Sequence, residues 1–183
     1  MVLTHQLKSL QYLELQRDGL DGDLAKLSDQ APWQPWVEAL LCSRGIKALT
    51  AMTLMTEIGD IRRFASPTGL MAYVGLIPGR RSSGETWHRG KLTNAGNPHL
   101  RRILVESAWQ CRHRGRATQR LLARRRGKDP ELVAIAQKAQ QRLARKYWLL
   151  NERKGTYKAV GAVARELCGF IWHALWVVAE KEK

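Results

Sequence analysis

The sequence predicts a mainly α-helical protein made of several helices, and three observations lead to this prediction. Apolar residues recur at three- and four-residue spacing along most of the 183-residue chain, as on the buried face of a helix. A capping residue followed by proline marks helix starts at Ser66-Pro67, Asn97-Pro98 and Asp129-Pro130. Strand-like alternation is confined to a short hairpin expected around residues 86–92. With 44% hydrophobic residues, the chain can bury a sizeable core.

The first expected element is an amphipathic, coiled-coil-like helix over residues 2–29. Its leucines follow helical spacing at Leu3, Leu7, Leu10, Leu13, Leu20 and Leu27. Gly19 and Gly22 each weaken the middle by about 1 kcal/mol relative to alanine, so the segment is either one long helix or a broken helical hairpin. Its apolar stripe pairs within the chain, pairs between chains or packs on its own domain. We expect residues 1–30 to form a separate segment through which the protein makes a homo-oligomer.

Residues 40–58 resemble a helix-hairpin-helix element. An apolar helix end is followed by a tight turn at Gly45-Ile46, and a second helix opens near Ala48. In that motif the turn and the N-terminus of the second helix contact a phosphate without reading bases. Lys47 stands where the motif usually has its second glycine, and an ordinary helical corner is the alternative interpretation.

Further helices are expected on both sides of a basic loop. One runs from Ser66 to Gly75, and the next starts at Asn97. The second has a clean buried stripe, formed by Leu100, Ile103, Leu104, Ser107, Ala108 and Cys111. Arg101 and Arg102 fall off this stripe and are expected to face solvent or phosphate. Residues 31–128 are predicted to form one domain that contains these helices and the loop.

The last third of the chain predicts a helical pair that packs on this domain. One helix runs from Asp129 to about Leu150 and the other from Lys158 to about Glu180, so the pair spans residues 129–183. The apolar run over residues 167–178 is shorter than the ~20 residues that span a membrane and contains His173, so we expect a buried helix and no membrane association.

The three cysteines and the N-terminus favour a cytoplasmic protein. Cys42, Cys111 and Cys168 are far apart and odd in number, which predicts reduced, buried thiols and neither a disulfide framework nor a metal site. The N-terminal residues lack the apolar core of a signal peptide.

Positive charge is concentrated in the middle of the chain. The net charge is +15, yet residues 1–60 hold 5 basic and 8 acidic residues, while residues 79–128 hold 14 basic and 2 acidic ones. Such a block is typical of nucleic-acid binding, and a solvated basic face is the alternative. The candidate phosphate-binding residues are Lys47, Arg80, Arg81, Arg89, Lys91, Arg101, Arg102, Arg124, Arg125 and Arg126.

Two serines lie within this block, in a stretch that reads as a tight basic loop. Ser82 and Ser83 precede Gly84, and the cations around them are Arg80, Arg81, Arg89 and Lys91. A hydroxyl among four cations is suited to hold or to attack a phosphate. A serine hydroxyl is a weak nucleophile that needs a base or a metal nearby, and Glu85 and His88 are the local candidates for a base. A basic surface loop without chemistry is the alternative.

A series of short motifs carries a resemblance to a known family. They are Gly45-Ile46, TEIGD at 56–60, Arg63-Phe64, YVGL at 73–76 with Pro78, SSG at 82–84, Gly96-Asn97 and Leu100-Arg101. In order and spacing this series resembles the C-terminal transposase domain of the IS110/IS116/IS902 insertion-sequence family, over about residues 40–125. The preceding helix resembles the coiled-coil segment that comes before that domain in the family.

The resemblance implies a DNA recombinase whose active site has two halves. One half is an N-terminal RuvC-like domain with four metal-binding acids, and the other is this domain with a nucleophilic serine, at Ser83 in this chain or alternatively at Ser82. Mg²⁺ is expected only with the RuvC-like domain, which leaves no cofactor in this chain. Some members are guided by a structured bridge RNA, so DNA and a guide RNA are the expected partners.

The chain has no room for the RuvC-like domain. It is therefore expected to be a truncated gene, an isolated domain, or a remnant whose partner half lies on another polypeptide, and to be inactive alone. The function predicted is the DNA-binding part of a transposase that supplies a serine for strand cleavage and rejoining. The alternatives are a basic nucleic-acid-binding module whose serines only contact phosphate, and a structural role through the first helix.

Overall fold

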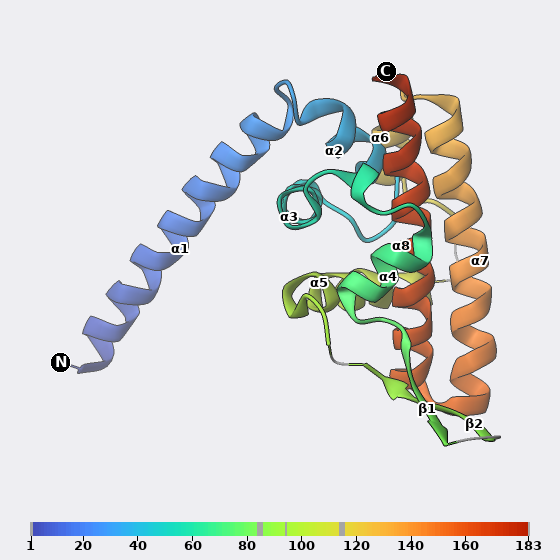
Figure 1. The fold of residues 1–183 in the computed structure, drawn as a ribbon. Coiled ribbons are helices and arrows are strands. Elements are labelled where there is room, and N and C mark those ends of the chain that lie inside the picture. The colour runs from blue at the N-terminus through green and yellow to red at the C-terminus, as the bar shows by residue number, and fades with distance from the viewer. Residues whose placement is uncertain (1, 84–85, 94, 114–115, 183) are drawn as a thin grey trace.

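The computed structural model describes residues 2–83, 86–93, 95–113 and 116–182, and it is mainly helical, as predicted (Figure 1). The helices are α1 (Val2–Ser28), α2 (Gln34–Leu41), α3 (Ala48–Ile58), α4 (Pro67–Val74), α5 (Pro98–Trp109), α6 (Gln119–Arg125), α7 (Pro130–Lys154) and α8 (Thr156–Lys181). Two short 3₁₀ turns, η1 (Ile61–Arg63) and η2 (Gln110–Arg112), and two strands, β1 (Pro78–Ser83) and β2 (Thr86–Leu92), complete the described elements.

Helix α8 is the central element of the core. It lies antiparallel beside α7 and also packs against α2, α4 and α5. Leu167, Ile171 and Leu175 on α8 are almost completely buried. By length and hydropathy α8 would suffice to cross a membrane, but most of its apolar window is buried inside the fold. The apolar run at 167–178 is therefore a core helix, as expected from the sequence.

Helix starts are fixed by the predicted caps. The Ser66 hydroxyl accepts from the Gly69 amide, the Asn97 side chain accepts from the His99 and Leu100 amides, and the Asp129 carboxylate accepts from the Glu131 amide. Each cap is followed by a proline, whose missing N–H is not needed in the first turn. The three predicted cap–proline starts are confirmed. Helix α8 begins earlier than expected, because Gly155 ends α7 and Thr156 already has helical backbone.

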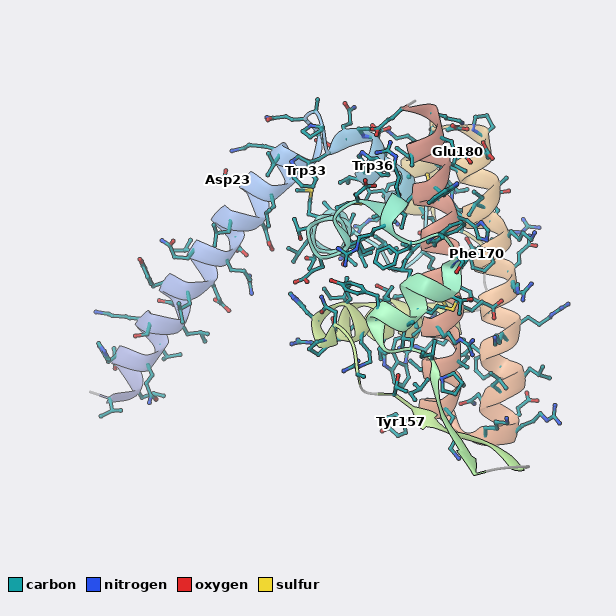
Figure 2. The ribbon with its side chains drawn as sticks, viewed as in Figure 1. Asp23, Trp33, Trp36, Tyr157, Phe170 and Glu180 are labelled. Carbon is teal, nitrogen blue, oxygen red and sulfur yellow. The ribbon has the colours of Figure 1, made fainter. Side chains whose placement is uncertain are left out.

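Helix α1 is one continuous helix that projects from the body (Figure 1). The broken hairpin considered for this segment is not formed, since the helix runs unbroken through Gly19 and Gly22. Neither position requires glycine, because a Cβ there would meet nothing within 4 Å. Leu3, Leu7 and Leu10 are 69%, 50% and 53% exposed. Trp33 and Trp36 lie where α1 joins the body (Figure 2). The N-terminal part of the α1 stripe is thus not covered by the described part of this chain, while the C-terminal end of α1 contacts α3.

The stretch expected to be a basic loop is a β-hairpin. β1 and β2 pair antiparallel, with Arg80 opposite Arg89, Ser82 opposite Trp87 and Ser83 opposite Thr86. A short hairpin was expected around residues 86–92, and the structure has one, but residues 86–92 form only its second strand and the serine-bearing segment before them is the first. The residues of β1 (PGRRSS) carry no alternating apolar signal, so backbone pairing with β2 decides their conformation.

Candidate nucleic-acid site

The two candidate serines lie at the end of β1 that is farthest from the core. Ser83 pairs with Thr86 in the last described pair of the hairpin, and Pro78 pairs with Leu92 at its base. The side chains of the hairpin residues singled out from the sequence lie outside the described part of the structure: Arg80, Arg81, Ser82, Ser83, Arg89 and Lys91. Their backbone positions bring two basic and two serine positions of β1 opposite β2, and the roles expected of them stay predictions.

The base of the hairpin is anchored to three helices. The Thr93 amide donates to the Ile77 carbonyl at 2.9 Å, and the Asn97 amide donates to the Tyr73 carbonyl at 2.9 Å. Gly75 and Gly96 have φ angles of +78° and +114°, and a Cβ there would lie 2.0 Å from the Ala95 carbonyl oxygen and 2.5 Å from that of Tyr73. Both glycines are therefore required where the two chain segments meet.

A carboxylate that was not among the predicted site residues completes this anchor. The Glu57 carboxylate, at the end of α3, accepts from the Asn97 side-chain amide at 2.7 Å and lies 3.1 Å from the His99 ring Nδ1. The hydrogen bond from Asn97, and then that from His99, lower the pKa of Glu57 below its usual 4.5. The motifs at 56–60 and 96–97 contain Glu57 and Asn97, but their spacing gives no sign that the two residues meet.

Arg101 also belongs to this anchor. Its guanidinium is half-buried and donates to the Val74 carbonyl at 3.0 Å. Arg102, its neighbour on α5, is exposed and pairs with Glu106 at 2.9 Å. Of these two candidates for phosphate binding, Arg101 thus stabilises the C-terminal turn of α4, and Arg102 lies on the surface beside a carboxylate.

A second candidate site lies at the short turn that joins α2 to α3, where a helix-hairpin-helix element or an ordinary helical corner was expected. Gly45 has a φ of +85°, and a Cβ on it would lie 2.6 Å from the Ser107 carbonyl oxygen of α5. The turn borders an open groove of about 730 Å³. We call this the basic groove; it is lined by Arg44, Gly45, Ile46, Lys47, Thr50, Gln110, His113, Arg116, Thr118, Leu121 and Arg124.

Two arginines are fixed in the walls of the basic groove. The Arg44 guanidinium donates to the His113 and Arg116 carbonyls at 3.1 and 2.9 Å, and the Arg124 guanidinium donates to the Ile46 carbonyl at 2.6 Å. Burial lowers the pKa of Arg124 below its usual value. These bonds join the α2–α3 turn to a segment more than 60 residues later in the chain, which the sequence did not reveal.

The basic triplet at 124–126 is divided by burial. Arg125 is 7% exposed, and its guanidinium donates to the Cys42 carbonyl at 2.9 Å and to the Gln140 side chain at 3.2 Å. Arg126 is exposed. Arg125 therefore holds α6 against the body, while Lys47, Arg124 and Arg126 lie at or near the surface.

No metal site is formed by the described residues, since no three of their His, Cys, Asp or Glu side chains gather in one place. Cys42, Cys111 and Cys168 are buried free thiols, as expected. Burial raises the pKa of Cys111 to about 11 and that of Cys168 to about 12, so these thiols stay protonated and unreactive at neutral pH.

Comparison with known proteins agrees with the resemblance to a transposase family. Residues 37–123 match the model described as the Transposase IS116/IS110/IS902 family. The chain is 46% identical over 135 residues to the predicted transposase y4qE of Sinorhizobium fredii, covering 73% of this chain and 35% of the relative. It is 31% identical over 141 residues to the transposase for insertion sequence element IS1533 of Leptospira borgpetersenii, covering 74% and 39%. The chain thus spans little more than a third of the length of these curated relatives.

Proposed function

This chain belongs to the IS116/IS110/IS902 transposase family and corresponds to its C-terminal region, and we propose on this basis that it supplies the serine half of a DNA-cleaving active site. The observation that supports the proposal most directly is the serine hairpin. Ser82 and Ser83 lie at the far end of two paired strands whose base is fixed by Glu57, Asn97 and two glycines. Such a base holds the hairpin in one orientation, as a displayed nucleophile requires.

The proposed reaction is a transesterification at phosphorus. The Ser83 Oγ forms a bond to the phosphorus of a DNA phosphodiester, and the bond from that phosphorus to one sugar oxygen breaks. The serine hydroxyl loses its proton to a base, and the released sugar oxygen takes up a proton. The phosphoserine link keeps the energy of the broken bond, so the reverse reaction rejoins a strand without a nucleotide cofactor.

The partners follow from this proposal. DNA is the substrate, a structured guide RNA is a further partner, and the protein acts in the bacterial cytoplasm. The described residues offer no cluster that fits Mg²⁺, so we assign the metal, with its acidic ligands, to a separate RuvC-like domain. The chain is expected to be inactive until that domain is supplied.

A covalent-trapping experiment tests the serine. A DNA substrate whose cleaved end cannot be rejoined is incubated with the protein and the acidic RuvC-like half of a relative, and DNA-linked protein is resolved on a denaturing gel. We expect an adduct with the wild-type protein that is lost in Ser83→Ala and kept in Ser82→Ala. An adduct lost only in Ser82→Ala would move the role to Ser82, and an adduct that survives both changes would remove serine chemistry.

A second candidate function is a nucleic-acid-binding module without chemistry of its own. The basic groove favours it, because its cations lie on the α2–α3 turn, on α6 and in the segment before α6, and its described lining contains no serine. Under this alternative the trapping experiment gives no adduct, while nucleic-acid binding is retained.

A further inference from the structure

We infer that the basic groove binds the phosphate backbone of duplex nucleic acid, as a site separate from the serine hairpin. The inference rests on the proposed function and assigns part of the surface that holds the nucleic acid. It gives a binding role to Arg44 and Arg116, which the sequence did not single out, alongside Lys47 and Arg124.

The charge of the groove favours a polyanion. Four cations line it, Arg44, Lys47, Arg116 and Arg124, and its described lining contains no carboxylate. Elsewhere on the surface many cations lie beside acids, as Lys128 does beside Glu38 at 2.7 Å. Phosphates along a nucleic-acid backbone provide the repeated negative charge that such a groove would neutralise.

The geometry holds this charge in place before a ligand arrives. Arg44 and Arg124 are fixed by bonds to backbone carbonyls, while Lys47 and Arg116 are exposed and able to reach outward. Lys47 is also the N-cap of α3, has extended backbone and makes no side-chain cap bond, so the first-turn amides of α3 are not covered by a cap. A helix N-terminus adds partial positive charge and N–H donors that suit a phosphate oxygen.

The lining indicates backbone contact without base recognition. Its described residues include no Phe, Tyr or Trp ring on which an unpaired base could stack, and the imidazole of His113 is its single aromatic group. It also offers no Asn or Glu for base edges, and its single glutamine, Gln110, is on η2 at the edge of the α5 C-terminus. We therefore expect binding that depends on salt and little on sequence. DNA and RNA duplexes share this phosphate chemistry, and the experiment distinguishes them.

The experiment measures binding of the full chain to a short labelled DNA duplex, and to an RNA duplex of the same sequence, by fluorescence anisotropy over a range of salt. The test variant is Lys47→Gln/Arg116→Gln. The control is Lys8→Gln/Lys26→Gln, which removes two positive charges from exposed positions of α1. We expect the slope of log affinity against log salt to fall by about 2 in the test variant, since each lost phosphate contact removes about 0.9, and to stay near the wild-type value in the control.

The outcomes separate this inference from the proposed function. Wild-type protein that binds neither duplex would overturn both. Wild-type binding with equal slopes in the two double variants would overturn the groove and leave the proposed function standing. A fall in slope on one duplex only supports the groove and identifies that backbone as its ligand. Circular dichroism checks the fold, and the Lys47→Gln and Arg116→Gln single variants, each expected to lower the slope by about 1, replace the double variant if it melts early.

Discussion

At the residue scale, burial decides which basic side chains can contact a nucleic acid. Arg125 is buried and satisfied by a carbonyl and an amide oxygen, whereas Arg126, the next residue, is exposed. A buried guanidinium held by neutral oxygens stabilises the fold and is not available to a phosphate. We therefore rank Lys47, Arg116 and Arg124 above Arg125 as nucleic-acid contacts, although Arg125 lies in the basic block and Lys47 does not.

The clearest pH-dependent residue of the described structure is Glu166 on α8. Burial works against its charged form, but ion pairs and hydrogen bonds with Lys146 and Arg142 of α7 outweigh that effect and lower its pKa below 4.5. Because the folded-state pKa lies below the unfolded one, this stabilisation is present above about pH 4.5 and is lost as the pH falls through the lowered value.

We expect Glu166→Gln to lower the free energy of unfolding by about 1–2 kcal/mol at pH 7 and by less at an acidic pH below the lowered pKa of Glu166. Urea denaturation at both pH values, followed by circular dichroism, measures this. The control is Glu152→Gln, which removes an acid from an exposed position of α7. An equal loss of stability at both pH values would show that Glu166 acts by packing and not by charge.

At the element scale, α1 differs from the other long helices, because most of its length does not pack on the body of the protein. It extends from the body with its leucines exposed, and a helix of 27 residues with seven-residue leucine spacing is suited to pair with a second copy. Isolated helices depend on tertiary packing for most of their stability. We propose that α1 packs against α1 of another protomer.

Replacing Leu3, Leu7 and Leu10 together by aspartate is expected to convert a dimer into a monomer, because the charges would be buried in the paired interface. Sedimentation equilibrium measures the mass. Leu149→Asp is the control, since Leu149 is 54% exposed on α7 and outside α1. A wild-type monomer, or a triple variant that remains dimeric, would contradict pairing through α1.

At the scale of the whole molecule, charge is segregated along the chain. Residues 1–60 carry more acids than bases, while residues 79–128 hold 14 of the 31 basic residues. The fold places parts of this block on two separate elements, the hairpin and the basic groove. If the hairpin and the basic groove both bind nucleic acid, the affinity would depend on their total positive charge more than on either serine.

We therefore expect Ser83→Ala to leave duplex affinity and its salt slope unchanged, although it removes the covalent adduct. Fluorescence anisotropy at several salt concentrations measures both quantities. A Ser83→Ala variant that loses affinity at every salt concentration would contradict the separation of binding from chemistry. The Ser82→Ala variant provides the matched control.

Local sequence determined the helical class, the capped helix starts and the buried stripe of α5. Each of these depends on a short stretch, as Ser66-Pro67 and Asn97-Pro98 show, because caps and periodicity act within a few residues. The family motifs likewise located the stretch that matches the family, residues 37–123, since their order in the sequence is itself the signal.

Tertiary structure alone decided how these parts meet. Glu57 joins Asn97, and Arg124 reaches the Ile46 carbonyl, across separations of 40 and 78 residues. Local sequence patterns likewise did not predict that β2 pairs with β1, or that Arg125 is buried. Long-range contacts depend on which surfaces pack together, and no spacing within one segment encodes that. The basic groove exists only because α6 packs beside the α2–α3 turn, so the sequence alone could not predict it.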